Sequence, residues 1–336
     1  MTMRALELAA APGIENLQLV RRPKPTPGPG EVRVRMTAAS LNHRDLGLIS
    51  GRLKRPLPIT PFSDGCGVVD AIGPGVTEVE PGERVVSLFF QDWEAGAPDK
   101  EKLASALAYP LPGVGREYAI LAERGLARAP DFLTDQEAAT LPCAALTAWQ
   151  ALMDLGRVRP GATVVLLGTG GVSIFALQFA LAAGCRTIIT SSSDSKLAEC
   201  RRLGAHETIN YRSNPDWAAE VVRLTGAGAD LVVEVGGAGT LEQSVRAVKI
   251  GGEVMVVGAL TGRGDYNIAQ IITTCVTLRG LFVGSREMFS SMCRAIEMHK
   301  IRPVIDRVYP WSEASTALRA MERGEHFGKI VLDFSV

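Results

Sequence analysis

The stretch VVLLGTGGVS at residues 164–173 decides the fold, because its apolar run enters a glycine-rich turn and the helix-forming run VSIFALQFALAAG (172–184) follows. Glycines at 168, 170 and 171 allow a tight turn and a close approach to a ligand. The following helix presents N–H groups and a positive dipole end to an anion. The residues Gly168, Thr169, Gly170, Gly171 and Val172 are therefore predicted to hold a dinucleotide pyrophosphate, a purely structural turn being the alternative.

Apolar strand-like runs and helix-like runs alternate on both sides of this loop. Strands are expected at 163–168, 187–190, 231–235, 253–258 and 277–284, and helices at 171–183, 194–203, 215–224 and 240–250. This alternation predicts an α/β fold with a doubly wound parallel sheet of the Rossmann class, covered by helices on both faces.

The first 127 residues have a different rhythm, with short β-type runs such as EVRVRM and ERVVSLFF separated by Gly and Pro. They predict an irregular, mostly antiparallel β domain. The polar insert at 91–117 is expected to form an exposed loop. After residue 285 come two helical stretches, 286–300 and 312–323, and a last strand, GKIVLDF.

Composition excludes several classes of function. The 336 residues are 46% hydrophobic, and 36 basic residues balance 36 acidic ones, which argues against a general binder of nucleic acid or membrane surfaces. No apolar run is long enough for a membrane helix, and the N-terminus lacks a secretion-signal pattern. The six cysteines form no C-x-x-C pair, so we expect buried free thiols and a cytoplasmic location.

The strand after the glycine loop ends in TSSSDSK (190–196) and indicates which nucleotide binds. NAD sites usually place a carboxylate there to bind the ribose 2′-hydroxyl. Here Ser191 and Ser192 can donate hydrogen bonds to a 2′-phosphate, and Lys196 can neutralise it. NADP(H) is therefore favoured over NAD(H), although Asp194 counts against this choice unless it caps a helix that begins at Ser195.

With this order of segments the chain resembles the medium-chain dehydrogenase/reductase superfamily over essentially its whole length. The motifs that carry the resemblance are GPGEVRVRMTAASLNHRDLGLISG, PFSDGCGVVDAIGPGV, PGERV, LPCAALTAWQAL, GTGGVS, GGEVMVVG and GKIVL. The resemblance implies a GroES-like irregular β-barrel domain at 1–127 and 286–336, around a Rossmann domain at 128–285. It also implies a homodimer joined through edge strands of the Rossmann sheets.

The zinc-dependent branch of this family differs from the chain at its metal site. Where that branch has Cys, and then His and Glu, this sequence has Asn42, Ser63 and Asp64, and only Cys143 matches a ligand position. One thiol without an imidazole does not make the three-ligand site that catalytic zinc requires. The stretch that corresponds to the structural zinc lobe, 91–117, contains no cysteine. We therefore expect no metal, and the chain resembles the zinc-free, quinone-reductase-like branch.

By the same resemblance Asn42, Arg44, Asp45 and Asp64 are candidates for the catalytic site. Asn42 could donate a hydrogen bond to a carbonyl oxygen, and Asp45 could orient Arg44 or a water molecule. The alternative for NHRD (42–45) is a polar turn in which Asn42 or Asp45 caps a helix. His43 is a candidate proton relay or an exposed bystander.

The resemblance also places further residues near the cofactor, and strand ends support several of them because an open α/β sheet binds ligands at that edge. These candidates are Thr147, Tyr211, Gly258, Ala259, Phe282, Val283 and Lys329, the last matching a basic position that can reach the pyrophosphate. Aromatic side chains that could select a planar substrate are Phe62, Phe89, Phe90, Trp93 and Tyr109, although such residues are also common in cores.

Together these observations predict an NADP(H)-dependent oxidoreductase that passes hydride to a quinone, an enone or a related carbonyl. Without a Lewis acid a conjugated acceptor reacts more readily than a simple ketone, because negative charge spreads to its oxygen. One alternative is a metal-free alcohol or aldehyde dehydrogenase. Another, of a different class, is an NADPH-binding sensor or structural protein with little turnover.

Overall fold

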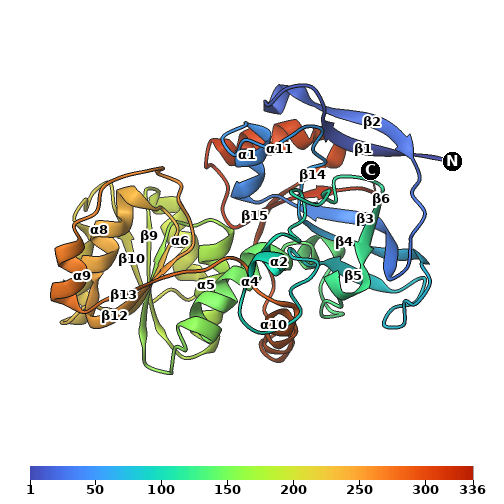
Figure 1. Ribbon diagram of the computed structural model, residues 1–336. Coiled ribbons are helices and arrows are strands. Elements are labelled where there is room, and N and C mark those ends of the chain that lie inside the picture. Colours follow the sequence, from blue (N-terminus) through green and yellow to red (C-terminus); the bar gives the residue numbers. More distant parts are fainter. Residues whose placement is uncertain (336) are drawn as a thin grey trace. The chain divides into compact units, whose positions relative to one another are not determined.

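The computed structural model describes residues 1–335 and divides into two compact units, both drawn in Figure 1. Unit 1 comprises Met1–Leu146 and Gly284–Val336, and unit 2 comprises Thr147–Val283. Each unit has its own principal sheet and its own hydrophobic core. No helix in the described part of the chain is long and apolar enough to cross a membrane.

Unit 2 contains the predicted parallel sheet, with strands in the order β10-β9-β8-β11-β12-β13 and every neighbouring pair parallel. The strands are β8 (Thr163–Leu167), β9 (Arg186–Ser191), β10 (Glu207–Asn210), β11 (Ala229–Glu234), β12 (Val248–Val256) and β13 (Thr277–Gly280). The chain proceeds from β8 outward to one edge and then returns to β11 on the other side of β8. This reversal makes β8 and β11 the switch point of a doubly wound sheet.

Helices follow the strands of unit 2, as Figure 1 shows in green to orange. They are α5 (Gly171–Ala182), α6 (Asp194–Arg202), α7 (Trp217–Thr225), α8 (Ala238–Ala247) and α9 (Ile268–Thr274). Helix α5 is buried along most of its length, which explains why its sequence is apolar on all sides. Helix α9 has no buried residue.

Unit 1 is built on a mixed sheet with the order β14-β15-β3-β4-β5-β7, and β6 also pairs with β3. Its strands are β3 (Glu31–Ser40), β4 (Asp64–Ile72), β5 (Arg84–Ser87), β6 (Tyr118–Ala122), β7 (Leu126–Ala127), β14 (Ile305–Pro310) and β15 (Lys329–Asp333), while β1 (Thr2–Leu8) and β2 (Leu17–Pro23) form a separate pair. The last strand, β15, runs antiparallel to β3, so both segments of unit 1 contribute to one sheet (Figure 1).

The helices of unit 1 are short except near its C-terminal segment. They are α1 (His43–Ile49), α2 (Lys100–Leu103), α3 (Asp135–Ala138), α10 (Arg286–His299) and α11 (Ala314–Glu322). A π-type turn, Leu141–Ala145, precedes α4 (Leu146–Trp149), within which the chain passes from unit 1 to unit 2. Phe62, Leu41 and Trp311 are fully buried in the core of unit 1.

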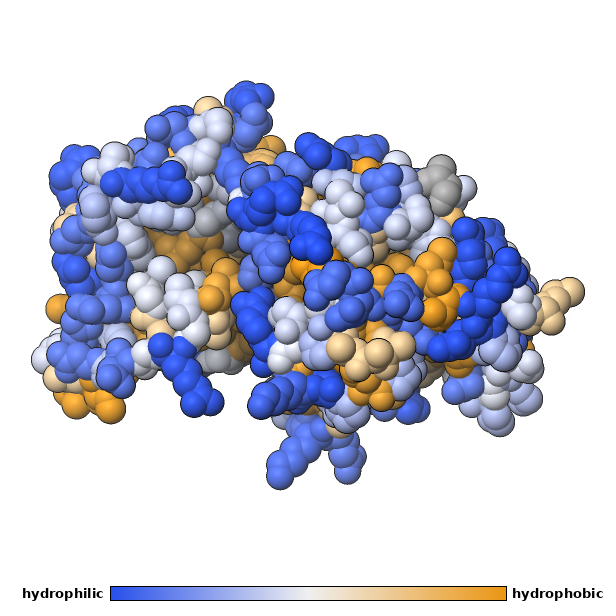
Figure 2. All heavy atoms as spheres, turned by 90° about the horizontal axis from the view of Figure 1, so that it is seen from above, coloured by the Kyte–Doolittle hydropathy of each residue, from blue (hydrophilic) through white to orange (hydrophobic). Residues whose placement is uncertain are grey.

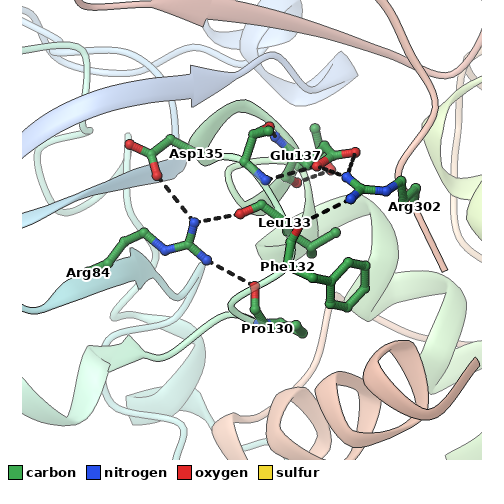
Figure 3. A network of polar contacts seen from close by, with 9 residues as sticks. Arg84, Pro130, Phe132, Leu133, Asp135, Glu137 and Arg302 are labelled. Carbon is green, nitrogen blue, oxygen red and sulfur yellow. Dashed lines mark hydrogen bonds and ion pairs between the residues drawn. The ribbon is translucent and has the colours of Figure 1, made fainter. Parts of the chain in front are cut away.

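Residues 128–146 lie in unit 1, whereas the sequence had suggested that the Rossmann domain begins at 128. Two arginines explain the difference, as Figure 3 shows. Arg84 on β5 donates to the carbonyl oxygens of Leu133 and Pro130 at 2.6 and 2.9 Å, and Nη1 of Arg302 donates to both carboxylate oxygens of Glu137 at 2.9 and 2.8 Å. These contacts join residues far apart in sequence, so strand and helix patterns do not reveal them.

Several local expectations need correction. Strand β14 and helix α9 were not expected, and β13 ends at Gly280 although a strand was predicted to 284. The insert at 91–117 is only partly an exposed loop, since Leu107 and Val114 are fully buried. All six cysteines are free thiols, as expected, but Cys275 is exposed.

Candidate functional site

In unit 2 the glycine loop forms the turn between β8 and α5, as its sequence predicts. Gly168 has a φ of +71°, a left-handed conformation that favours glycine. A Cβ atom at Gly168 or at Gly170 would meet no other atom within 4 Å, so open space lies beside the loop backbone. Gly170 is the N-cap of α5 and supplies no side chain to its first turn. The loop and helix terminus therefore fit a pyrophosphate group.

Ser173 occupies the position of the third glycine in the dinucleotide-binding pattern. It is buried, and its hydroxyl donates to the carbonyl oxygen of Leu167 at 2.6 Å. This hydrogen bond ties the first turn of α5 to the end of β8. A small polar side chain thus provides the close packing of helix on strand that a glycine would allow.

The structure brings together the residues expected near the adenosine ribose. The backbone N–H of Tyr211 donates to the carbonyl oxygen of Ser191 at 3.1 Å, so the end of β9 lies beside the residue after β10. The expected cap was wrong: α6 begins at Asp194, and Ser193 is its N-cap, accepting from the N–H of Lys196 at 3.4 Å. Asp194 accepts a hydrogen bond from the Asn210 side chain at 2.7 Å.

Glu234, at the end of β11, is a buried carboxylate that sequence reasoning missed. Its Oε1 accepts from the backbone N–H groups of Gly236 and Gly237 at 2.6 and 2.9 Å and from the Thr240 hydroxyl at 2.7 Å, and its Oε2 accepts from Ser244. The carboxylate therefore shapes the loop at the carboxyl end of the sheet. A single charged residue inside the apolar run LVVEV was the signal that could have revealed it.

The candidates Gly258 and Ala259 lie beside this loop. The N–H of Gly258 donates to the carbonyl oxygen of Glu234 at 3.2 Å, and a Cβ on Gly258 would lie 2.2 Å from the carbonyl oxygen of Val235. Ala259 approaches Gly237, where a Cβ would lie 2.7 Å from the Cα of Ala259. Glycine at 258 is thus required by the close approach of two loops at the edge of the sheet where ligands bind.

Three further cofactor candidates lie in unit 2. Thr147 is buried on α4, Phe282 is half-exposed and Val283 is buried. Val283 has a φ of +58°, which is unusual for a β-branched residue and indicates a backbone held under strain. The predicted contacts of these residues with a cofactor stay predictions.

In unit 1 a cluster of polar side chains surrounds Lys329. This residue is the first of β15 and is only 4% exposed, and its ammonium group donates to the carbonyl oxygen of Leu41 and to Oδ1 of Asn42, the latter at 2.7 Å. Burial lowers the pKa of Lys329, whereas the charges of Asp64 and Asp45 raise it. The predicted contact of Lys329 with a pyrophosphate stays a prediction, and the structure gives its ammonium group these two other partners.

Asp64 and Ser63 lie in the same cluster, as expected. The Ser63 hydroxyl donates to Asp64 Oδ1 at 2.6 Å, and the backbone N–H of Cys143 donates to Asp64 Oδ2 at 2.9 Å. Burial raises the pKa of Asp64, while the charge of Lys329 opposes the rise. Burial likewise raises the pKa of the Cys143 thiol far above its ordinary value, so this side chain is a neutral thiol.

Asn42 and Asp45 form the turn that starts α1. Oδ2 of Asp45 accepts from the backbone N–H of Asn42 at 2.8 Å, which bears out the capping role considered for NHRD. Oδ1 of Asp45 is buried and has no hydrogen-bond partner among the described residues, whereas a hydrogen bond from the Asn42 side chain favours the charged form of Asp64. Burial raises the pKa of Asp45 to about 7. His43, at the first position of α1, is exposed.

Arg44 hydrogen-bonds to carbonyl oxygens, while the charges of Asp45 and Asp64 still act on it. Its guanidinium donates to the carbonyl oxygens of Leu107 and Tyr109 at 2.8 and 2.7 Å and lies over the ring of Phe89 at 4.8 Å. Burial lowers the pKa of Arg44, and Asp45 opposes this shift through its charge. The structure thus shows Arg44 fastening the 107–109 turn, and its predicted catalytic role stays a prediction.

The aromatic residues proposed for substrate selection belong mainly to the core of unit 1. Phe89, Phe90 and Trp93 are at most 2% exposed and pack against one another. Phe62 is fully buried with a φ of +70°, a strained conformation immediately before Ser63.

The polar cluster does not fit a zinc ion. The side chains around Lys329 offer an amide, a hydroxyl, a carboxylate and a neutral thiol, from Asn42, Ser63, Asp64 and Cys143. The ammonium group of Lys329 is bound among them, and a divalent cation at the same place would be repelled by it. Across residues 1–335 no group of three or more His, Cys, Asp or Glu side chains is arranged to hold a metal ion.

Two family models match the chain. The alcohol dehydrogenase GroES-like domain matches residues 28–131, and the zinc-binding dehydrogenase domain matches residues 171–298. The first falls within unit 1 and includes Asn42 and Asp64. The second begins at the first residue of α5 and includes the glycine at 258.

Individual relatives cover nearly the whole chain. A zinc-type alcohol dehydrogenase-like protein of Schizosaccharomyces pombe is 43% identical over 314 residues, which are 90% of this chain and 91% of the relative. The crystal structure of a protein described as a putative alcohol dehydrogenase from Sinorhizobium meliloti has a TM-score of 0.92 at 38% identity, covering 99% and 98% of the two chains.

Two mycobacterial structures are also similar at 28% identity, each covering 98% of this chain and 99% of the other. One is a complex with NADPH and has a TM-score of 0.84. The other is described as a quinone oxidoreductase and has a TM-score of 0.81.

Proposed function

Because the chain belongs to the medium-chain dehydrogenase/reductase superfamily and is an NAD(P)H-dependent oxidoreductase, we propose that it reduces a quinone, an enone or a related conjugated carbonyl without zinc. Bound NADPH supplies the hydride in this reaction. The substrate is a small molecule, in keeping with the alcohol dehydrogenase-like relatives.

The position of Lys329 carries this proposal. A buried ammonium group is bound to Asn42 and influenced by the charges of Asp64 and Asp45. The cluster therefore already contains a cation, the Lys329 ammonium group, at the position where the zinc-dependent members of the family bind zinc. A conjugated acceptor suits such a site, because charge that arises on hydride addition spreads to oxygen and a hydrogen-bond donor suffices to stabilise it.

A preference for NADP(H) over NAD(H) is supported by the end of β9. The strand finishes with Ser191, Ser192 follows it, and Lys196 lies in the first turn of α6. These side chains can donate to a 2′-phosphate or neutralise its charge. The nearby Asp194 is held by Asn210, which favours a structural role for this carboxylate. A mycobacterial relative in complex with NADPH also supports the preference.

Oxidation of an alcohol or reduction of an aldehyde is the second candidate function. Several relatives, including that of S. pombe at 43% identity, are named for alcohol dehydrogenase activity. Hydride transfer is the same step in both candidates, but an unconjugated carbonyl places all of the developing charge on one oxygen. The second candidate function therefore requires the hydrogen-bond donors around Lys329 to stabilise that oxygen more strongly.

We also propose that the protein is a cytoplasmic homodimer. The free thiols of all six cysteines suit a reducing compartment. Strand β13 is the edge of the unit 2 sheet, and α9, which contacts α8 and β12, exposes Ile268 and Ile272 by 68% and 72%. Figure 2 shows apolar groups at its left edge, the side on which α9 lies in Figure 1. An open edge strand and exposed apolar side chains favour association of two unit 2 sheets.

Steady-state assays with NADPH and a panel of acceptors test the proposed function. The panel contains 1,4-benzoquinone, an enone, an enal, a saturated aldehyde and, with NADP⁺, primary alcohols. We expect kcat/KM for the quinone or the enone to exceed that for the saturated aldehyde by at least tenfold. A preference for the saturated aldehyde and the primary alcohols would instead support the second candidate, and no turnover with any of them would contradict both.

A further inference from the structure

Glu234 is the last residue of β11 and is fully buried at the carboxyl end of the unit 2 sheet. Four donors converge on its side chain: the backbone N–H groups of Gly236 and Gly237 and the hydroxyls of Thr240 and Ser244. All four belong to the turn after β11 or to α8. Hydrogen bonds to a charged group are stronger than those between neutral groups, so this carboxylate fixes the path of the turn.

The turn after β12 is tied to the same carboxylate-centred turn. The backbone N–H of Val257 donates to the carbonyl oxygen of Glu234 at 2.8 Å. The backbone N–H and the hydroxyl of Thr261 both donate to the carbonyl oxygen of Gly236, at 2.8 and 2.9 Å, and the hydroxyl accepts from the N–H of Gly239 at 2.7 Å. The turns that follow β11 and β12 therefore form one hydrogen-bonded assembly, and Glu234 is its buried centre.

This assembly lies where one half of a dinucleotide is expected. A dinucleotide binds across the switch point of a doubly wound sheet, here β8 and β11, with one mononucleotide on each side. With the pyrophosphate on the glycine loop and the adenosine ribose at the end of β9, the nicotinamide half falls on the ends of β11 and β12. Gly239 and Ala259 are exposed on these two turns, so their backbone is open to a ligand.

The helices that follow the two switch-point strands differ in charge at their N-termini. At α5 the N-cap is Gly170, with open space beside it and no acidic residue in the first turn. At α8 the N-cap is Gly237, whose N–H already donates to the Glu234 carboxylate. A phosphate is attracted to the first terminus and repelled from the second. The turn after β11 is therefore left for the part of the coenzyme beyond its phosphates.

We propose that Glu234 is a positioning residue for the nicotinamide half of the coenzyme. Its carboxylate holds the turns after β11 and β12 in the form that receives the nicotinamide ribose, and it acts through their backbone without touching a reacting atom. The inference concerns binding of the coenzyme, so it holds whichever acceptor the enzyme reduces.

The test compares two ligands by isothermal titration calorimetry: NADPH, and 2′,5′-ADP, which carries the adenosine half alone. Glu234→Met keeps an unbranched side chain but removes the acceptor, so the Kd for NADPH should rise by about tenfold while that for 2′,5′-ADP changes less than about twofold. NADH and AMP form a second such pair. An equal rise for whole coenzyme and fragment would show that Glu234 only supports the fold, and would overturn the inference, as would an unchanged Kd for NADPH.

Glu253→Met is the matched control, because Glu253 lies on the neighbouring strand opposite Leu231, toward the start of both strands. It should leave both Kd values as in the wild type. In Glu234→Gln the amide oxygen can still accept from the turn, and the amide nitrogen can donate to the Ser244 hydroxyl. This variant should bind NADPH within about threefold of the wild type, and a loss as large as that of Glu234→Met would overturn the role given to the accepting oxygen.

Thermal melting and circular dichroism show whether each variant folds. If Glu234→Met does not fold, Thr240→Val removes one donor to the carboxylate with little change of shape. It should raise the Kd for NADPH by at least about twofold and leave that for 2′,5′-ADP unchanged. Unchanged NADPH binding by folded Thr240→Val, or an equal loss of both ligands, would then overturn the inference.

Discussion

Buried charge is concentrated in a few residues of unit 1. Asp45, Asp64 and Lys329 are each at most 4% exposed, and they influence one another's pKa values. Burial of charge without close pairing costs stability. Residues kept at such a cost are typical of active sites, where the environment adjusts protonation to the chemistry.

The stability cost of burying a charged group can be measured at Asp45. Burial raises its pKa from 3.8 to about 7, so its folded form resists ionisation. The protonated carboxyl therefore contributes stability that is fully present below the ordinary pKa of 3.8. This stability is lost as the pH rises through the folded-state pKa of about 7. Asp45→Asn keeps the polar side chain but removes the charge. The wild type should lose this stability between pH 5 and pH 8, and Asp45→Asn should not. Over that range the free energy of unfolding of Asp45→Asn should therefore rise by roughly 2–3 kcal/mol relative to that of the wild type.

Urea unfolding at the two pH values measures this difference. Asp131→Asn is the control, because Asp131 is an exposed carboxyl of the same unit and its replacement should leave the pH dependence unchanged. An equal pH dependence in Asp45→Asn and the wild type would show that Asp45 is not the group whose ionisation is resisted.

Several site residues could be predicted because they are polar residues at the positions where the zinc-dependent branch has its metal ligands. By the family resemblance Asn42, Ser63 and Asp64 stand where the zinc-dependent branch has its ligands, and the structure brings the last two into hydrogen-bond contact. The place of Lys329 beside Asn42 could not be anticipated, because 287 residues separate them and only the pairing of β15 with β3 unites them. Asp45 was expected to orient Arg44 or a water molecule, whereas the hydrogen bonds of Arg44 go to carbonyl oxygens of a distant turn.

At the scale of elements, the proposed preference for NADP(H) depends on the turn from β9 into α6. Ser193 caps the helix, so Lys196 is held in its first turn, one turn beyond Ser191. The 2′-phosphate distinguishes the two coenzymes, and a lysine that contacts it contributes to binding of one only. Lys196→Ala should therefore raise KM for NADPH by about tenfold, ~1.4 kcal/mol, and change KM for NADH little.

Arg201→Ala is the matched control for this prediction, because it removes the same charge from the exposed last turn of the same helix. Initial rates with each coenzyme at a saturating acceptor concentration give the four KM values. Equal increases for NADPH and NADH in Lys196→Ala would assign Lys196 to a part of the site that both coenzymes share.

Strongly patterned elements were predictable from sequence, and weakly patterned ones were not. The apolar runs of β8 and α5 share a glycine turn, and the predicted and observed bounds differ by only one residue at each element's end. Strand β14 contains Asp306 and Arg307 and is largely exposed, so it lacks the alternation of a half-buried strand. Helix α9 has no buried face to give it a helical period.

For the whole molecule, the order of segments predicted the class of each unit but not the limits between them. Strand and helix patterns in a sequence indicate local structure only, and the segment 128–146 shows no clear pattern of either kind. Arg84 and Arg302 attach it to unit 1 through carbonyl oxygens and Glu137 (Figure 3). These contacts join residues that are far apart in the sequence, so they cannot be predicted from local sequence patterns.

Association of two chains is a prediction at this scale. Ile272 on α9 is 72% exposed, so a lysine can replace it without disturbing the core of unit 2. If unit 2 sheets pair at β13, Ile272→Lys should convert a dimer to a monomer in light scattering at micromolar concentration. Met298→Lys, on α10 of unit 1 and 80% exposed, should stay dimeric. A wild-type monomer, or dimerisation of Ile272→Lys equal to that of the wild type, would contradict the proposed interface.

The central claim is that hydride transfer in this protein proceeds without a metal. Its most direct measurement is the rate of NADPH-dependent enone reduction after exhaustive dialysis against a chelator, with the metal content of the same sample determined by elemental analysis. We predict an unchanged kcat at far less than one zinc per chain, and no increase when zinc is added. A rate that falls in proportion to the metal removed and returns with zinc would contradict the claim.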